Sequence, residues 1–242
     1  MKSLLLSTSI ATSLLFSSVI SAENISVAQQ KQLSEITDLL KQNPEIIDEL
    51  HTNLTQYIES QGTISKTLEL HHDYLYNNPM HSYLGSETPK LTVINFTDYN
   101  CPYCKRLESG LVEMIKKYPE IRIVNIYLPF QQRMIPGLET NTAWYALNVW
   151  ENNRASFAEV HRLMMAKPAR HDRQSIMKIA EITGTEAALT ANKMKQQLVE
   201  KNEQIFGQLG LRGTPALIIG EQIIPGFIPQ AQLDKLINAQ LK

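Results

Sequence analysis

Two cysteines three positions apart, Cys101 and Cys104, are the only cysteines in this 242-residue chain. They lie in the stretch NFTDYNCPYCKR, residues 95–106. Two thiols at this spacing can cycle between a dithiol and a disulfide, or they can bind a soft metal ion. A structural disulfide here would close a loop too short to constrain the unfolded chain much. A structural zinc site needs four ligands, and the histidines form no ligand pattern with the pair. The spacing therefore favours redox chemistry, provided that the surrounding elements position the pair for it.

The elements around the pair are predicted to form a β-α-β unit. The run LTVINF at 91–96 is rich in β-branched residues and predicts a strand. Pro102 suits the first position of a helix, because it has no N–H to leave unpaired. Apolar residues then repeat every three or four positions until Pro119. The run IRIVNIYL at 121–128 predicts a second strand. The two cysteines thus lie at the N-terminus of a helix between two strands.

This placement predicts different roles for the two cysteines. A helix N-terminus carries partial positive charge and free N–H groups, and both favour a thiolate at Cys101. Lys105 and Arg106 add positive charge nearby. Cys104 lies one turn further along the helix and is expected to be less exposed. We therefore expect Cys101 to exchange with substrate and Cys104 to resolve the mixed disulfide. The redox-active Cys101–Cys104 disulfide would be the only redox group, so we expect no separate cofactor or metal.

The C-terminal part predicts the second half of a thioredoxin fold. Residues 216–219 and 222–224 form two short apolar runs around a Gly-Glu turn, and 230–241 has the pattern of an amphipathic helix. A β-α-β half followed by a β-β-α half is the thioredoxin arrangement. The fold class that we expect is α/β, a thioredoxin fold with a helical insertion between its two halves and an N-terminal α-helical extension.

The insertion, at about 133–207, contains three helical patterns: NTAWYALNVWENN, QSIMKIAEITG and EAALTANKMKQQLVEKNEQIFGQLG. Its aromatic residues, Trp144, Tyr145 and Trp150, have helical spacing, which favours core packing over a binding surface. Met164 and Met165 are adjacent and do not share a helix face, so packing is favoured over metal binding for them too.

The motif Cys101-Pro102-Tyr103-Cys104, with Thr214-Pro215 before a late strand, resembles the DsbA-like thiol–disulfide oxidoreductases of bacterial cell envelopes. The resemblance covers about residues 88–242. It is closest to the branch with a helical N-terminal extension, which includes ScsC-like and Com1-like proteins. It implies a cis peptide bond at Pro215 facing the cysteines, and a Thr214 backbone that pairs with an extended substrate. Pro102, Tyr103 and Lys105 are taken as supporting residues of the site.

One position departs from the pattern of thioredoxin-fold enzymes. Many of them carry a buried carboxylate six residues before the first cysteine, where this chain has Asn95. An amide cannot accept a proton from the resolving thiol as a carboxylate can. Either proton transfer uses water or another group, or Asn95 is simply a hydrogen-bonded core residue; the second interpretation is favoured.

The first 87 residues are predicted to hold a signal peptide and a helical extension. Residues 1–22 combine Lys2, an apolar run and a small-residue end, which is typical of a cleaved secretory signal. Within 23–87, apolar residues at alternating spacings predict helices at about 28–42 and 44–60, the second capped by Asn43, and 71–85 reads as a linker. The apolar faces of these helices need a partner. Self-association through residues 28–60 and packing on the chain's own thioredoxin domain are the two alternatives.

The composition and net charge of the chain exclude some classes of function. The chain is 43% hydrophobic and 19% charged with a formal net charge of −1, which gives no sign of nucleic-acid or membrane-surface binding. Three hypotheses follow. The first is a periplasmic enzyme that forms or isomerises disulfides in unfolded or misfolded exported proteins, with a membrane redox partner that re-oxidises or reduces the pair. The second is a Cu(I)-binding envelope protein that uses the same thiols. The third is a helical scaffold in which the redox pair is secondary.

Overall fold

The computed structural model describes residues 25–242, so the predicted signal peptide at 1–22 lies outside the described residues. The chain divides into two compact units, with the division between Tyr57 and Ile58. Within the described residues, no helix has the length and apolar character needed to span a membrane.

The first unit is helical in the part that the structure describes. α1 (Val27–Gln42) begins at a capping box in which Ser26 and Gln29 exchange hydrogen bonds. A 3-10 turn, η1 (Pro44–Ile46), precedes α2 (Ile47–Leu70), whose last residues belong to the second unit. Neither α1 nor α2 contains a fully buried residue. Packing within this unit therefore leaves the predicted apolar faces uncovered.

The structure corrects two details of these helices. Asn43 holds the N-cap position before Pro44, as predicted, but its side chain makes no capping hydrogen bond there and donates instead to the carbonyl of Leu39 at 2.8 Å, at the end of α1. The helix predicted to end at 60 continues to Leu70. Ile64 and Leu68 pack against a buried cluster on the sheet. This packing outweighs the weak helix propensity of the residues between them.

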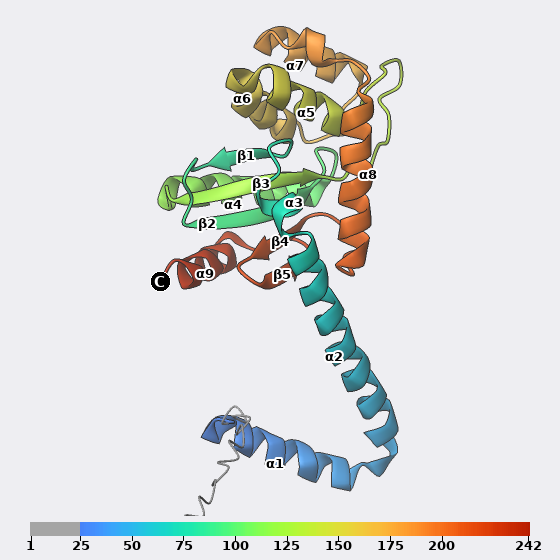
Figure 1. Ribbon diagram of the computed structural model, residues 1–242, viewed down its shortest axis with the longest axis vertical. Coiled ribbons are helices and arrows are strands. Elements are labelled where there is room, and N and C mark those ends of the chain that lie inside the picture. Colours follow the sequence, from blue (N-terminus) through green and yellow to red (C-terminus); the bar gives the residue numbers. More distant parts are fainter. Residues whose placement is uncertain (1–24) are drawn as a thin grey trace, which may run out of the picture. The chain divides into compact units, whose positions relative to one another are not determined.

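The second unit is built around a five-stranded sheet of order β1-β3-β2-β4-β5 (Figure 1). The central strands, β2 (Leu91–Thr97) and β3 (Ile121–Tyr127), are parallel, and β4 (Ala216–Ile219) and β5 (Gln222–Pro225) add antiparallel strands. α4 (Pro102–Lys117) connects β2 to β3, and α9 (Gln230–Gln240) follows β5. These elements form the thioredoxin fold that the sequence predicted.

Pleating sends alternate residues of the central strands to opposite faces of the sheet. Val93 and Ile123 join the cluster beneath α4 and α9. Ile94 and Val124 join the cluster on the other face, which also contains residues of α8 (Lys193–Gln208). Both faces are thus covered, which explains why these strands read as nearly continuous apolar runs.

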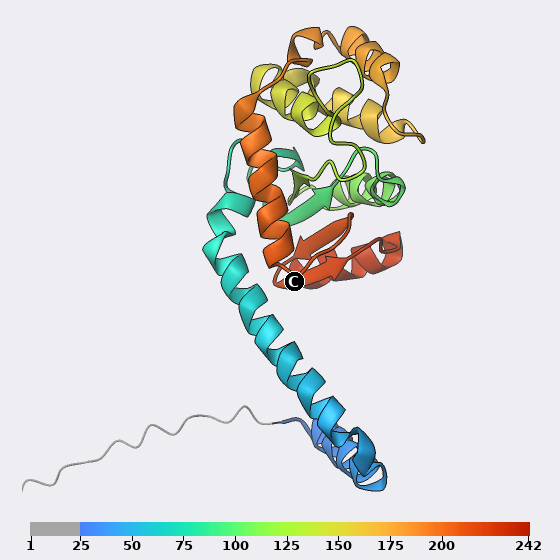
Figure 2. The same ribbon diagram turned by 90° about the vertical axis from the view of Figure 1, so that its right-hand side faces the viewer.

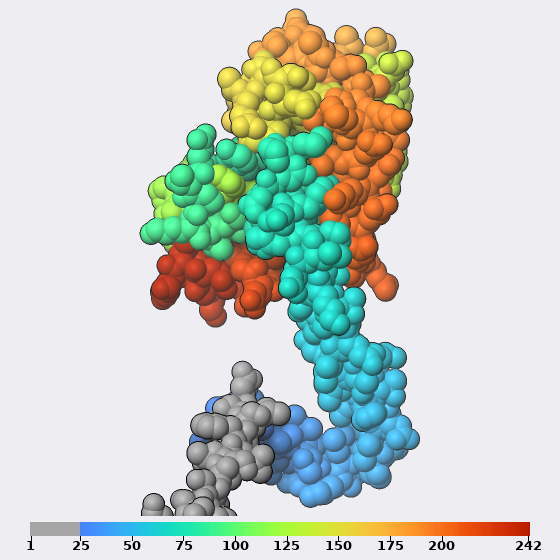
Figure 3. Space-filling model, in the orientation of Figure 1, coloured from blue at the N-terminus to red at the C-terminus, as the bar shows by residue number. Residues whose placement is uncertain are grey.

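The segment predicted as a linker, 71–85, is structured, which corrects that interpretation. It contains α3 (His72–Tyr76) and the edge strand β1 (Ser82–Gly85), which pairs antiparallel with β3. The Tyr74 hydroxyl donates to Asn202 Oδ1 on α8 at 2.7 Å, and Figure 3 shows the two segments side by side, teal against orange. The local sequence of this segment is typical of a loop. It is nevertheless ordered, because β1 pairs with β3 and α3 packs against α8.

The insertion contains more helices than the three predicted patterns. Within the described residues 133–207 it comprises α5 (Thr142–Asn152), α6 (Arg154–Ala166), α7 (Arg173–Thr183), the 3-10 turn η2 (Glu186–Ala188) and most of α8. The helix α6 was not predicted from the sequence. η2 and α8 were predicted as one helix. Asn192 separates them, because its side chain caps α8 by accepting hydrogen bonds from the first backbone N–H groups of that helix. Figures 1 and 2 both show α8 running from the insertion alongside the sheet.

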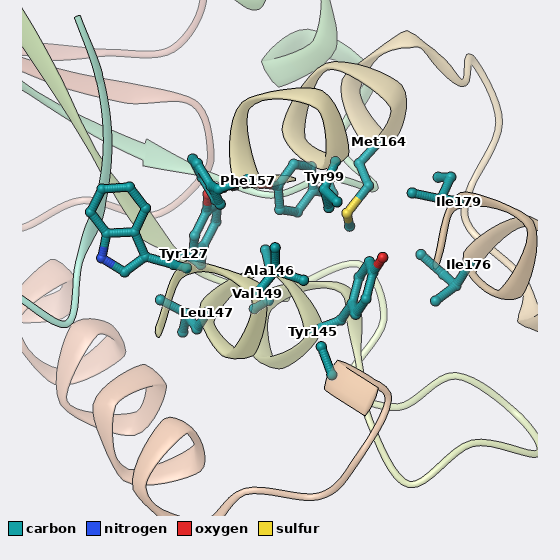
Figure 4. Packing of buried hydrophobic residues seen from close by; sticks show 14 of the residues in the cluster. Tyr99, Tyr127, Tyr145, Ala146, Leu147, Val149, Phe157, Met164, Ile176 and Ile179 are labelled. Atoms are coloured by element: carbon teal, nitrogen blue, oxygen red, sulfur yellow. Dashed lines mark hydrogen bonds between the residues drawn. The ribbon is translucent and has the colours of Figure 1, made fainter. Parts of the chain in front are cut away.

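The insertion has its own apolar core, shown close up in Figure 4. Tyr145, Trp150, Met164 and Met165 are buried, which confirms the packing interpretation for them. Trp144 is only partly buried at the edge of the same cluster. Tyr99 and Tyr127 also belong to this cluster, so it joins the insertion to the segments beside the cysteines.

Candidate active site

Cys101 and Cys104 lie at the N-terminus of α4, as the sequence predicted. Cys101 is the N-cap residue and Pro102 the first residue of the helix. Both are free thiols with little exposure, 4% for Cys101 and 2% for Cys104. The expected contrast in exposure is therefore small, and the two cysteines differ instead in their electrostatics.

The pKa values of the two thiols move in opposite directions. The hydrogen bond from Cys104 is the main cause that lowers the pKa of Cys101 to about 5, against the opposing effect of burial. Backbone hydrogen bonds from Cys104 and Tyr103 and the Thr214 side chain lower it further. Burial raises the pKa of Cys104, and the interaction with Cys101 raises it more. At neutral pH the pair thus holds a thiolate at Cys101 and a protonated thiol at Cys104.

The Thr214-Pro215 segment faces the cysteine pair. Its peptide bond is cis, as the resemblance implied. In the protonated form, the Cys101 thiol donates to the Thr214 carbonyl with a sulfur–oxygen distance of 3.3 Å. Pro215 directly precedes β4, which pairs with β2, so the sheet holds this segment in place beside Cys101.

Asn95 is the hydrogen-bonded core residue that the favoured interpretation predicted. It is 2% exposed, and its Nδ2 donates to Asn125 Oδ1 at 3.0 Å across the β2–β3 pair. It shares the sheet face of Val93, which α4 covers. The Asn95 Oδ1 atom has no hydrogen-bond partner among the described residues, and an amide at this place cannot take up or release a proton for the thiols as a carboxylate can.

Lys105 ties the active-site helix to the insertion. Its ammonium donates to the carbonyl of Ala169 at 2.8 Å and to that of Lys167, both in the loop between α6 and α7. Burial lowers the pKa of Lys105, whereas Asp98 and Cys101 act in the opposite direction. From the sequence, Lys105 was predicted only to add positive charge near the thiols. Its contact with the α6–α7 loop joins residues far apart in the chain.

Tyr103 supplies exposed aromatic surface beside Cys101. Its side chain is 58% exposed, and its ring centroid lies 6.5 Å from that of Phe227. The Arg106 guanidinium stacks over the Phe227 ring at 4.5 Å. The exposed Tyr103 ring thus forms aromatic surface close to Cys101.

Asp98 and Asn100 are site residues that sequence reasoning treated only as turn formers. The buried Asp98 carboxylate accepts from the Asn100 N–H at 2.8 Å and from the Gln131 N–H at 2.9 Å. Its carbonyl accepts from the Cys101 N–H at 3.0 Å. Asn100 Oδ1 accepts from the His171 N–H at 2.7 Å. The position of Asp98, an acidic residue between a strand predicted to be buried and the cysteines, could have indicated its role from the sequence.

A second buried network also escaped the sequence analysis. Glu108 on α4 lies 3.0 Å from His161 Nε2 on α6, and His161 Nδ1 lies 2.7 Å from the Tyr99 hydroxyl. The Tyr99 hydroxyl bonds in turn to Tyr127 at 2.8 Å. Glu108 and His161 also line a mainly apolar cleft of about 540 Å³ between α4 and α6. The network links the active-site helix to the insertion through polar groups that are satisfied in the interior.

No group of three or more histidine, cysteine, aspartate or glutamate side chains gathers as a metal site within residues 25–242. The Cu(I) hypothesis therefore rests on the two thiols alone and stays a prediction.

Comparison with known proteins agrees with this geometry. The family model described as DSBA-like thioredoxin domain matches residues 92–238. Disulfide bond formation protein D of Bacillus subtilis (strain 168) is 22% identical over 170 residues, which cover 66% of this chain and 76% of that protein. A linker-deletion mutant of Proteus mirabilis ScsC is 30% identical, with a TM-score of 0.69, over 91% of this chain and 99% of its own. A periplasmic thioredoxin-like protein from Salmonella enterica serovar Typhimurium is 34% identical, with a TM-score of 0.64, over 71% and 96%.

Proposed function

Since the chain belongs to the DSBA-like thioredoxin domain family of thiol–disulfide oxidoreductases, we propose that it forms and isomerises disulfides in exported proteins. The observation that carries this proposal is the opposed shift of two adjacent thiol pKa values at one helix N-terminus. A thiolate that is stable at neutral pH is both a ready nucleophile and a good leaving group.

Disulfide donation follows from the reaction at the oxidised pair. A substrate thiolate attacks the sulfur of Cys101, the Cys101–Cys104 bond breaks, and Cys104 leaves and takes up a proton. A second substrate thiolate then attacks the substrate sulfur of the mixed disulfide and expels Cys101 as a thiolate. The substrate loses two electrons and gains a disulfide, and the pair becomes a dithiol. Stabilisation of the Cys101 thiolate drives the second step.

Isomerisation uses the reduced pair. The Cys101 thiolate attacks a wrong substrate disulfide, forms a mixed disulfide and releases a substrate thiolate that can attack elsewhere. The raised pKa of Cys104 keeps it protonated, which slows its attack on this intermediate and gives the substrate time to rearrange. In this proposal the Thr214 backbone and the exposed Tyr103 hold an extended segment of the substrate beside Cys101.

The first unit supports self-association in this proposal. Leu33, Ile36, Leu50 and Leu54 on α1 and α2 are between 42% and 54% exposed. A second copy that covers these faces through residues 28–60 would remove them from water and bring several redox pairs to one substrate. Export through residues 1–22, residence in the periplasm and a membrane partner that resets the pair complete the proposal.

Activity of cysteine variants tests the proposed function. Cys101→Ser is expected to abolish both insulin reduction and the refolding of scrambled ribonuclease, because no nucleophile remains. Cys104→Ser is the matched control, since it keeps the nucleophile and is expected to trap mixed disulfides with substrate. Retention of either activity by Cys101→Ser would contradict the proposal.

A further inference from the structure

We propose that Asp98 is a positioning residue that sets the reactivity of Cys101: its buried carboxylate fixes the turn that presents Cys101 and places a negative charge that opposes the thiolate. The inference rests on the proposed function, because it concerns how the same redox pair is tuned. In this proposal, Asp98 sets how strong an oxidant the Cys101–Cys104 disulfide is.

The first observation is a buried carboxylate with no ion-pair contact within residues 25–242, on which Lys105 acts only through space. Asp98 is 1% exposed, and both hydrogen bonds to its carboxylate come from neutral backbone N–H groups, those of Asn100 and Gln131. Lys105 directs its ammonium to backbone carbonyls of the α6–α7 loop instead. Buried charges in proteins are normally paired, so this arrangement costs stability. Such a cost at a reactive site points to function.

The second observation is that the carboxylate cannot move away from the nucleophile. The Asp98 carbonyl accepts from the Cys101 N–H at 3.0 Å, so the two residues are the ends of one tight turn. The Asp98 side chain joins this turn to the loop after β3 through Gln131. Burial is the main cause that raises the pKa of Asp98; the negative charge of Cys101 on the same turn also raises it, and the Lys105 ammonium lowers it.

The other charged and titratable groups that face this turn come from two elements. α4 contributes Cys104 and Lys105. The loop between α6 and α7 contributes Lys167, Arg170 and His171. Arg170 donates to Gln131 Oε1 at 2.9 Å, and burial lowers the pKa of His171 to about 4, so its ring is neutral at pH 7. Asp98 is thus the carboxylate in this set that opposes the thiolate.

The consequence for the redox pair has a definite sign. Removing the Asp98 charge removes a repulsion from the Cys101 thiolate and so stabilises the reduced pair. A reduced pair that is more stable makes the disulfide a stronger oxidant. Loosening the turn would do the reverse, since the hydrogen bonds that hold the thiolate at the helix N-terminus would weaken.

Two variants of the full chain, Asp98→Asn and Asp98→Ser, test this. Ultraviolet absorbance of the thiolate against pH gives the pKa of Cys101, and equilibration with glutathione gives the stability of the disulfide. We expect the Cys101 pKa to fall by about one unit in Asp98→Asn, which keeps an oxygen acceptor for the turn, and by less in Asp98→Ser, which also loosens the turn. In Asp98→Asn the glutathione equilibrium is expected to move about tenfold toward the dithiol, or about 30 mV. Near-ultraviolet circular dichroism confirms that each variant is folded before it is titrated.

Asn100→Ala is the matched control, because it breaks the link of the same turn to His171 and keeps the Asp98 charge. It is expected to raise the Cys101 pKa or leave it unchanged. A purely structural role for Asp98 predicts that its variants also raise the pKa, and that outcome, or no change in either variant, would overturn the proposal. Both readouts are independent of any protein substrate, so failure of the proposed function in the Cys101→Ser assays is distinguishable from failure here.

Discussion

The two units of the chain place similar apolar residues in opposite environments. In the second unit, residues such as Ile94 and Ile126 are completely buried between the sheet and its helices. In the first unit, Leu33 and Leu54 are 52% and 54% exposed, on helices without a fully buried residue. The redox machinery is therefore complete within the second unit. The first unit carries apolar side chains that its own two helices leave exposed.

Truncating one apolar side chain in each unit gives the largest expected contrast. Ile126→Ala removes a side chain that is completely buried and is expected to lower the free energy of unfolding by about 2–5 kcal/mol. Leu33→Ala removes an exposed side chain and is expected to change the stability of the second unit by less than about 0.5 kcal/mol. Urea unfolding followed by tryptophan fluorescence measures both. Similar losses in the two variants would contradict the division.

Charges on the exposed faces are expected to change assembly and leave the redox pair intact. Ile36→Glu combined with Leu50→Glu would put two carboxylates into any interface that these helices form. Light scattering is expected to show a dimer or larger assembly for the natural chain and a monomer for the variant, with an unchanged Cys101 pKa. A monomer in both cases would refute self-association, and we would then assign the chain to disulfide donation alone.

The stability of the second unit is expected to depend on pH through Cys101. The folded pKa of about 5 lies below the reference value of 9.0, so the unfolded dithiol chain binds more protons in this range. Stability of the reduced protein should therefore rise between about pH 5 and pH 9, by at most about 1.4 kcal/mol per pH unit, and this contribution is lost as the pH falls through 5. Denaturant unfolding of the reduced protein at several pH values tests this. Cys101→Ser is the control, and an identical pH profile for the two proteins would contradict the depressed pKa.

The smallest effect is expected at the tether between α4 and the insertion. Lys105→Met keeps the length of the side chain and removes the hydrogen bonds to Lys167 and Ala169. A loss of about 1–3 kcal/mol is expected, with faster hydrogen exchange confined to the 167–171 loop. Arg162→Met, which loses only an exposed ion pair with Glu159, is the control. Equal exchange in the two variants would show that Lys105 does not hold the loop.

The parts of the fold that the sequence predicted are those with local signals. Short stretches of sequence were enough to predict the strands β2 and β3, the start of α4 at Pro102 and the role of the cysteine spacing. β1 has no such signal, because its pairing with β3 joins residues far apart in the chain. The helix α6 was missed although Phe157, Val160 and Met164 have helical spacing and are buried.

The same distinction applies to the site. Cys101, Cys104, Thr214 and Pro215 were predicted from a motif and a resemblance, and the structure brings them together. The burial of Asp98 depends on the Gln131 loop, and the role of Lys105 depends on the α6–α7 loop. Such long-range contacts are a property of the folded chain, and no local pattern encodes them.

Alkylation of the reduced protein as a function of pH, with mass spectrometry to identify the labelled cysteine, tests the central claim most directly. The claim is that one helix N-terminus holds a thiolate at Cys101 beside a protonated Cys104. It predicts that Cys101 alone is labelled, with a rate that rises through a midpoint near pH 5. Labelling of Cys104 at a similar rate, or a midpoint near the ordinary cysteine pKa of about 8.5, would contradict it.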